Sequence, residues 1–175
     1  MRKDLTCAAL AAAAFVGLAG PAWAAPIKVA AFAFELLDTS AEGDIRGAAR
    51  PDELRRIDQV SEQMRTFLTS KGLELVDVAP AQKDIDAQKL MTCGACPAGI
   101  AKTLGADYSA IGYVQKVSNL ILNLNVEIRD ARTGEVVRKG SADIRGNTEE
   151  SWRHGLSYLM RHTILEQPLP PVKAP

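Results

Sequence analysis

Histidine, cysteine and tryptophan are scarce in this chain, and their scarcity narrows the chemistry that it can support. There are two histidines, three cysteines and two tryptophans among 175 residues. A closed zinc site needs four ligands, and His154 and His162 would point roughly 80° apart on one helix. No Gly-x-Ser-x-Gly motif and no phosphate-binding glycine-rich loop occurs. We therefore predict no catalytic residue, no metal site built on these histidines and no cofactor.

An excess of either charge is also missing. The chain has 21 basic and 21 acidic residues, whereas a nucleic-acid-binding domain usually shows a basic excess gathered into a patch. The sequence therefore predicts no nucleic-acid partner.

Long apolar runs are missing beyond the N-terminus. Residues 1–24 combine Arg2 and Lys3, an alanine-rich apolar run, and Ala22 and Ala24 at the two positions that a signal peptidase reads. This pattern is typical of a Sec-type signal peptide cleaved after Ala24. The apolar run is shorter than the roughly 20 residues that span a bilayer. We expect a periplasmic or secreted protein with no membrane span after cleavage.

The first half of the remaining chain predicts a strand, a helix and a strand. The apolar run 27–34 predicts a buried strand. Pro51 and the helical periodicity after it predict a helix that Gly72 ends. Residues 73–78 predict a second strand, parallel to the first because a helix connects them.

The second half predicts a short helix, three successive strands and a closing helix. The strands fall at 108–117, 120–130 and 135–145, with turns short enough for an antiparallel meander. The last helix is predicted to begin with a capping box from Asn147 to Glu150. We predict an α/β (α+β) fold with a single mixed sheet, its elements in the order β-α-β-α-β-β-β-α.

About 150 residues after the leader fit one domain. We place a single α/β domain at residues 25–167 and a proline-rich, mobile tail at residues 168–175.

Cys93 and Cys96 are the cysteines left after removal of the leader. An even pair in an oxidising compartment predicts a disulfide. A Cys-x-x-Cys sequence before a helix is also found in thiol–disulfide redox proteins, but no proline occurs between residues 98 and 167 to present a cis-proline to the sulfurs. A structural disulfide is favoured, and a redox protein is the alternative.

An acidic loop offers a second alternative. Asp38, Glu42 and Asp44 resemble the first half of a calcium-binding loop, but Ala49 stands where a bidentate carboxylate belongs. A cation-binding envelope protein is the hypothesis that this loop supports.

The predicted strand 120–130 carries an unusual polar row. Alternate positions are apolar and face the core, so the residues between them share the opposite face. Asparagine is disfavoured within strands, and breaks of local rules are enriched at functional positions. We predict a partner-docking face here, although the outer face of any half-exposed sheet is also polar. Its predicted residues are Asn119, Asn123, Asn125, Glu127 and Arg129.

Three segments resemble a known family. They are residues 112–130, residues 143–152, and Cys93-x-x-Cys96 followed by residues 100–107. Together they resemble an uncharacterised domain-of-unknown-function family of short exported bacterial proteins. The order of elements is also similar, at fold level, to the N-terminal domain of TolB and to the CsgG domain. These resemblances imply a non-catalytic module that contacts an envelope protein partner.

Overall fold

A computed structural model of the protein describes residues 25–171. The predicted signal peptide at residues 1–24 and the last four residues of the predicted tail lie outside the described residues. The strands are β1 (Lys28–Ala31), β2 (Glu35–Asp38), β3 (Glu74–Leu75), β4 (Tyr108–Lys116), β5 (Ile121–Asp130) and β6 (Val136–Arg145). The helices are α1 (Ala41–Arg46), α2 (Pro51–Ser70), α3 (Gln82–Asp86), α4 (Cys96–Thr103) and α5 (Glu149–Leu159), with a 3₁₀ turn at Ala79–Ala81 and a π turn at Met160–Ile164.

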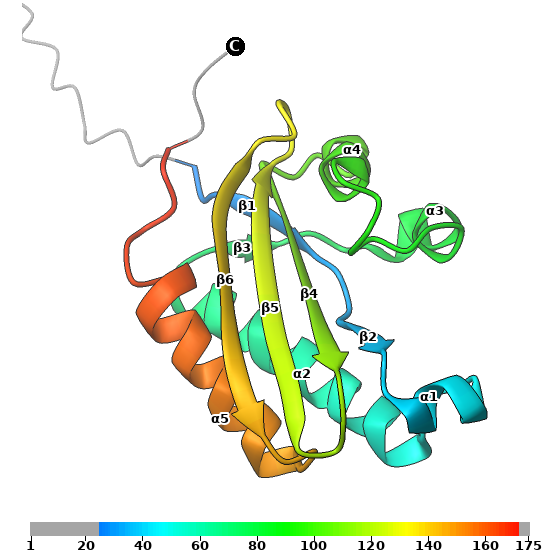
Figure 1. The fold of residues 1–175 in the computed structure, drawn as a ribbon. Coiled ribbons are helices and arrows are strands. Elements are labelled where there is room, and N and C mark those ends of the chain that lie inside the picture. Colours follow the sequence, from blue (N-terminus) through cyan, green and yellow to red (C-terminus); the bar gives the residue numbers. More distant parts are fainter. Residues whose placement is uncertain (1–24, 172–175) are drawn as a thin grey trace, which may run out of the picture.

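The strands form one mixed sheet, as predicted. Its order is β3-β1-β4-β5-β6, and β2 also pairs with β4. β1 is parallel to β3 and β4, whereas β4, β5 and β6 form the antiparallel meander. The closing helix follows (Figure 1), which confirms the predicted fold class.

The opening strand is divided, where a continuous run was predicted. β1 and β2 both pair with β4, and the chain between them turns the Phe34 ring into the core. A Cβ atom on Gly112 would lie 2.2 Å from that ring, so the glycine makes the notch that Phe34 fills. The Phe34 N–H donates to Ser61 Oγ on α2 at 2.8 Å.

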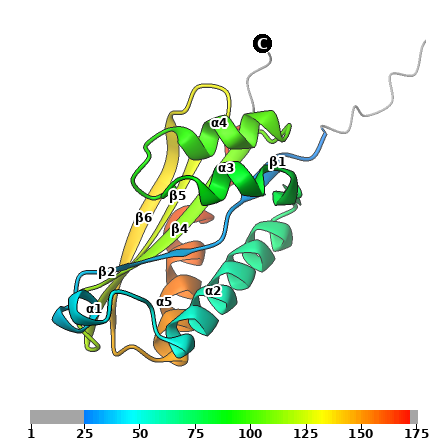
Figure 2. The same ribbon diagram turned by 90° about the vertical axis from the view of Figure 1, so that its right-hand side faces the viewer.

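Helices α2 and α5 cover one face of the sheet (Figures 1 and 2). Trp152 and Leu156 of α5, Met64 of α2 and Leu124 of β5 are all fully buried in the main core between these layers. A smaller apolar cluster lies under α4, on the other side of the sheet near the start of β4. Ile85 of α3 packs against the same cluster.

The start of the last helical segment differs from the predicted one. α5 begins at Glu149, and Thr148 is its N-cap because its side chain accepts from the Ser151 N–H. The proposed cap, Asn147, uses its amide elsewhere, as described below. Of the predicted tail, Leu169 is buried in the core, and the Pro170 carbonyl accepts from the Tyr108 hydroxyl at 2.8 Å.

Across residues 25–171, no helix has the length and apolar character needed to cross a membrane.

Candidate docking face and the charged cluster beside it

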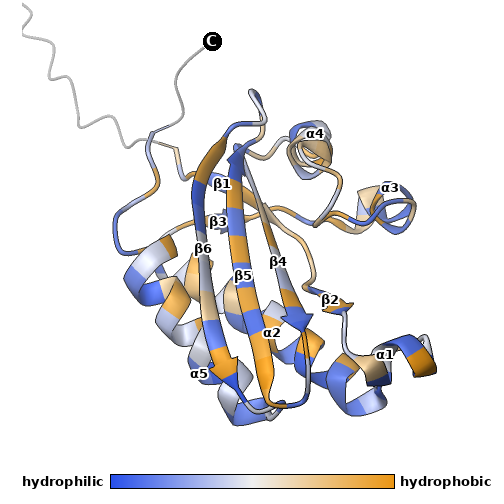
Figure 3. Ribbon diagram, in the orientation of Figure 1, coloured by the Kyte–Doolittle hydropathy of each residue, from blue (hydrophilic) through white to orange (hydrophobic). Residues whose placement is uncertain are grey.

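The side of the meander that faces away from α2 and α5 is the candidate docking face, called the open face below. Residues paired across strands share a face, so the pairing places its members together: Tyr113, Gln115, Asn123, Asn125, Glu127, Arg129, Lys139, Ser141 and Asp143. The alternation of hydrophobic and hydrophilic residues is visible along β5 in Figure 3. Four of the five predicted site residues lie here.

A ladder of hydrogen bonds fixes the β5 side chains of the open face. Asn125 Nδ2 donates to Asn123 Oδ1 at 2.6 Å, and Asn123 Nδ2 donates to Asp143 Oδ1 on β6 at 2.7 Å. Asn125 is only 8% exposed. Side chains held in this way lose little conformational entropy when a partner binds.

Glu127 extends the ladder toward the other end of β5. Its carboxylate accepts from Arg129 Nε at 2.5 Å and lies 3.1 Å from Lys139 Nζ on β6. The β5 side chains of the open face are thus polar groups whose charges are paired with neighbouring residues.

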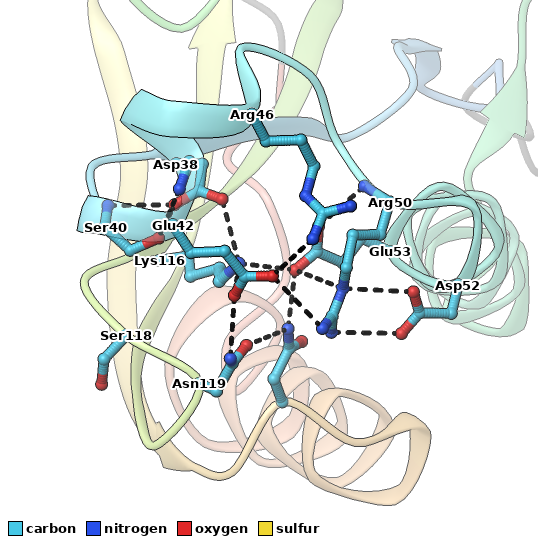
Figure 4. A network of polar contacts seen from close by, with 12 residues as sticks. Asp38, Ser40, Glu42, Arg46, Arg50, Asp52, Glu53, Lys116, Ser118 and Asn119 are labelled. Carbon is cyan, nitrogen blue, oxygen red and sulfur yellow. Dashed lines mark hydrogen bonds and ion pairs between the residues drawn. The ribbon is translucent and has the colours of Figure 1, made fainter.

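Asn119 does not join this row. It lies in the β4–β5 turn, and its Nδ2 donates to Glu42 Oε2 at 3.0 Å. Asn119 thereby belongs to a buried charged cluster at the end of the sheet, which sequence reasoning missed (Figure 4).

Lys116 is at the centre of this cluster and is 1% exposed. Its Nζ lies 2.8 Å from Glu53 Oε1 on α2, 3.0 Å from Asp38 Oδ2 at the end of β2 and 3.6 Å from Glu42 Oε2 on α1. Asn147 Nδ2 donates to Glu53 Oε1 at 2.7 Å, and Trp152 Nε1 donates to Asn147 Oδ1 at 3.1 Å. One buried cation therefore holds together the ends of β2, β4 and α2, and through Asn147 the start of α5.

The cluster perturbs the titration of its members. Burial alone would raise the pKa of Glu53, but hydrogen bonds from Lys116, the Arg50 N–H and Asn147 lower this pKa below the ordinary value. Burial would also raise the pKa of Asp38, but its bonds from Ser40 and Lys116 lower it. Burial opposes the charge on Lys116, but its bonds to Glu53 and Asp38 raise its pKa.

The direction of these shifts predicts a loss of stability in acid. Carboxylates whose pKa values are lowered by folding stabilise the protein fully above their unfolded-state values near 4, and this contribution is lost as the pH falls through the lower folded-state values. Lys116, with its raised pKa, stabilises the protein below about 10.4 and loses this contribution only above its folded-state pKa. We expect the melting temperature to be flat from pH 6 to 9 and to fall below pH 4, more steeply in the wild type than in Glu53→Gln. Calorimetry at stepped pH measures this, and parallel slopes for the two proteins would contradict it.

The three acidic residues of the proposed cation-binding loop do not lie together in the folded protein. Asp38 and Glu42 contact the Lys116 ammonium, while Asp44 is exposed and lies outside this set. Within residues 25–171, no three histidine, cysteine or acidic side chains lie close enough together to hold a metal ion.

Cys93 and Cys96 form a disulfide at the start of α4. Cys96 is the first residue of the helix, and Gly94 between the two cysteines has φ 72°, a conformation that favours glycine. Ile100 of the same helix is buried against the β4 side of the sheet. The bond therefore fixes the entry of a short helix that would be marginal alone.

Removing this disulfide should have a modest effect on stability. The loop-entropy relation for so small a ring gives about 2 kcal/mol, or a fall in melting temperature of about 5 °C for a domain of this size. We expect this for the Cys93→Ser/Cys96→Ser double variant, with binding of any partner retained. Loss of activity in a thiol–disulfide exchange assay, with stability unchanged, would support the redox alternative instead.

Comparisons with known proteins identify a family and several solved structures of low sequence identity. Residues 27–164 match the family model DUF3280, described as "Protein of unknown function (DUF2380)". No match was found among curated proteins.

Solved structures that match this chain include proteins of three kinds. The LpoB C-terminal domain from Escherichia coli has a TM-score of 0.49 and 17% identity, covering 73% of this chain and 88% of that one. Lipoprotein GNA1162 from Neisseria meningitidis has a TM-score of 0.46 and 18% identity, covering 71% and 83%. The PelC dodecamer from Paraburkholderia phytofirmans has a TM-score of 0.44 and 18% identity, covering 84% and 88%. Likenesses this distant transfer no function, and these matches do not support the specific likeness to TolB or CsgG.

Proposed function

The chain belongs to this family of proteins of unknown function, and we propose that it is an exported, non-catalytic interaction domain whose open face docks an envelope protein. The observation that carries the proposal is the hydrogen-bonded row of Asn123, Asn125 and Glu127 on the side of the meander that faces away from α2 and α5. A polar surface that is already ordered before binding favours specific docking by shape and hydrogen bonding.

The charge on the open face indicates what kind of surface it fits. Glu127 is neutralised by Arg129 and Lys139, and Asp143 is bonded to Asn123. A partner therefore meets amide and hydroxyl groups and paired charges rather than a field of one sign. The matching partner is a protein surface with its own donors and acceptors, and the signal-peptide pattern of residues 1–24 supports an encounter in the periplasm or outside the cell.

The proposal predicts a separation between binding and stability. The Asn123→Thr/Asn125→Thr double variant removes the amide ladder but supplies two residues with high strand propensity, so the melting temperature should change by only a few degrees. Capture of the partner from the native envelope should fall at least about ten-fold, the effect of losing roughly 1.4 kcal/mol of binding free energy.

Glu62→Thr is the matched control. This residue lies on the outer surface of α2, and its side chain is 73% exposed. It should capture the partner as the wild type does. If the double variant captures the same partner undiminished, the docking face lies elsewhere.

A further inference from the structure

The outer edge of β6 is the longest unpaired strand edge in the described part of the chain. β6 has ten residues and pairs only with β5, and Figure 1 shows it at the margin of the sheet with α5 behind it. The Gly146 N–H donates to Leu120 O at 3.2 Å, so the even-numbered residues of β6 direct their backbone groups toward β5. The backbone groups of Lys139, Ser141 and Asp143 therefore point outward.

Long free edges usually carry a feature that prevents pairing, such as proline, a bulge or charges of one sign. β6 contains no proline, and the register shift in its pairing lies near its start, opposite Ile128 and Arg129. Among the residues whose backbone groups point outward, Lys139 and Asp143 carry opposite charges and lie on either side of the small Ser141. This arrangement is self-complementary.

We propose that two copies of this chain pair antiparallel through β6, with Ser141 opposite its counterpart on the two-fold axis. Lys139 then lies opposite Asp143 of the partner subunit, and the contact occurs twice. Moving the axis to Ala142 would place Lys139 opposite Arg145 of the partner subunit, and moving it to Gly140 would place it opposite Ser141. The charges therefore select one register.

Both charged groups have capacity left for this contact. Lys139 contacts Glu127, but its side chain remains 59% exposed and its ammonium has three donors. Asp143 accepts from Asn123 with Oδ1, which leaves its second oxygen available.

The other side of β6 provides an apolar contribution near the same axis. A Cβ atom on Gly140 would meet Leu159 and Thr163, so the end of α5 runs beneath the centre of the proposed pairing. Tyr158, which is 62% exposed, lies on this part of α5 with its ring 4.9 Å from that of His162. Pairing through β6 would bring these rings toward their counterparts and would join the two open faces into one continuous surface.

Crosslinking tests the register. Residues opposite each other in a hydrogen-bonded antiparallel pair have Cα atoms about 5.5 Å apart, within the range of a disulfide. The wild type should sediment as a dimer at about 100 µM, and Ser141→Cys should form a disulfide-linked dimer on mild oxidation. Thr66→Cys, on the exposed surface of α2, should not. A monomeric wild type, or equal crosslinking of the two variants, overturns the proposal.

Charge complementation tests the register independently. Asp143→Lys and Lys139→Glu each place like charges opposite each other twice, and each should weaken the homodimer at least about ten-fold. An equimolar mixture of the two variants restores both opposite-charge contacts, so it should form a heterodimer close to wild-type affinity. Failure of the mixture to associate more tightly than either variant alone overturns the proposal.

Discussion

Lys116→Met should destabilise the protein by about 3–5 kcal/mol, because removing one partner of a buried ion pair leaves its counter-charges desolvated. Lys116 and Glu53 have side chains that are each 1% exposed and lie 2.8 Å apart. The substitution keeps the length and apolar stem of the side chain, so little of the loss comes from packing. For a domain of this size the melting temperature should fall by about 10 °C or more.

Two further variants separate this effect from a general response to charge removal. Arg46→Met breaks the Arg46–Glu42 pair, whose side chains are 50% and 33% exposed, and it should cost less than about 1 kcal/mol. The Lys116→Met/Glu53→Gln double variant should lose less unfolding free energy than the sum of its two single changes. Once Lys116 is replaced, Glu53 has already lost its ion-pair partner. Urea titration of the wild type, the two variants of Lys116, Arg46→Met and Glu53→Gln measures these differences. A loss below 1 kcal/mol in Lys116→Met would contradict the role assigned to the cluster.

Gly112→Ala should cost about 3 kcal/mol through overpacking. The added methyl group would lie 2.2 Å from the Phe34 ring, and Phe34 is 3% exposed and held between β4 and α2. Neither the ring nor the backbone of a central strand can move away without loss of other contacts.

The Gly112→Ala/Phe34→Leu double variant should be less damaging than the sum of its single changes, because a smaller side chain makes room for the methyl group. Gly99→Ala is the control, because its Cβ position in α4 has no atom within 4 Å apart from its chain neighbours and the backbone of its own helix. Alanine is the better helix former, so stability should be unchanged or slightly higher. Thermal and urea unfolding measure the set. A neutral Gly112→Ala would show that the Phe34 notch does not require glycine.

Local patterns in the sequence were sufficient for most of the fold. The helix of α2, the three strands of the meander and the parallel pairing of β1 with β3 all follow from periodicity and turn residues. The division between β1 and β2 could not be predicted, because it depends on Phe34 fitting against Gly112, 78 positions later in the chain. The Asn147 cap failed for a similar reason: Glu53 and Trp152 bind its amide, and Thr148 replaces it.

In the candidate site, too, local patterns predicted some features, whereas others depend on contacts between distant parts of the chain. The alternation along β5 placed Asn123, Asn125, Glu127 and Arg129 on one face correctly, since side-chain direction in a strand is a local property. Asn119, in a turn, is directed by its contact with Glu42 and not by the strand period. A signal for the charged cluster was present: Lys116 follows Tyr108, Ala110 and Val114 at the core-facing positions of β4. A lysine in that position requires a buried counter-ion, but only the folded chain identifies Glu53 and Asp38.

Site-specific photo-crosslinking in the native envelope tests the docking function most directly. A photoreactive amino acid at Gln115 lies on the open face opposite Asn123, whereas the same group at Glu62 projects from the outer surface of α2. If the open face docks a protein, Gln115 gives one defined adduct with another envelope protein and Glu62 gives none. The absence of an adduct from Gln115, or the same adducts from both positions, would contradict the function proposed for this domain.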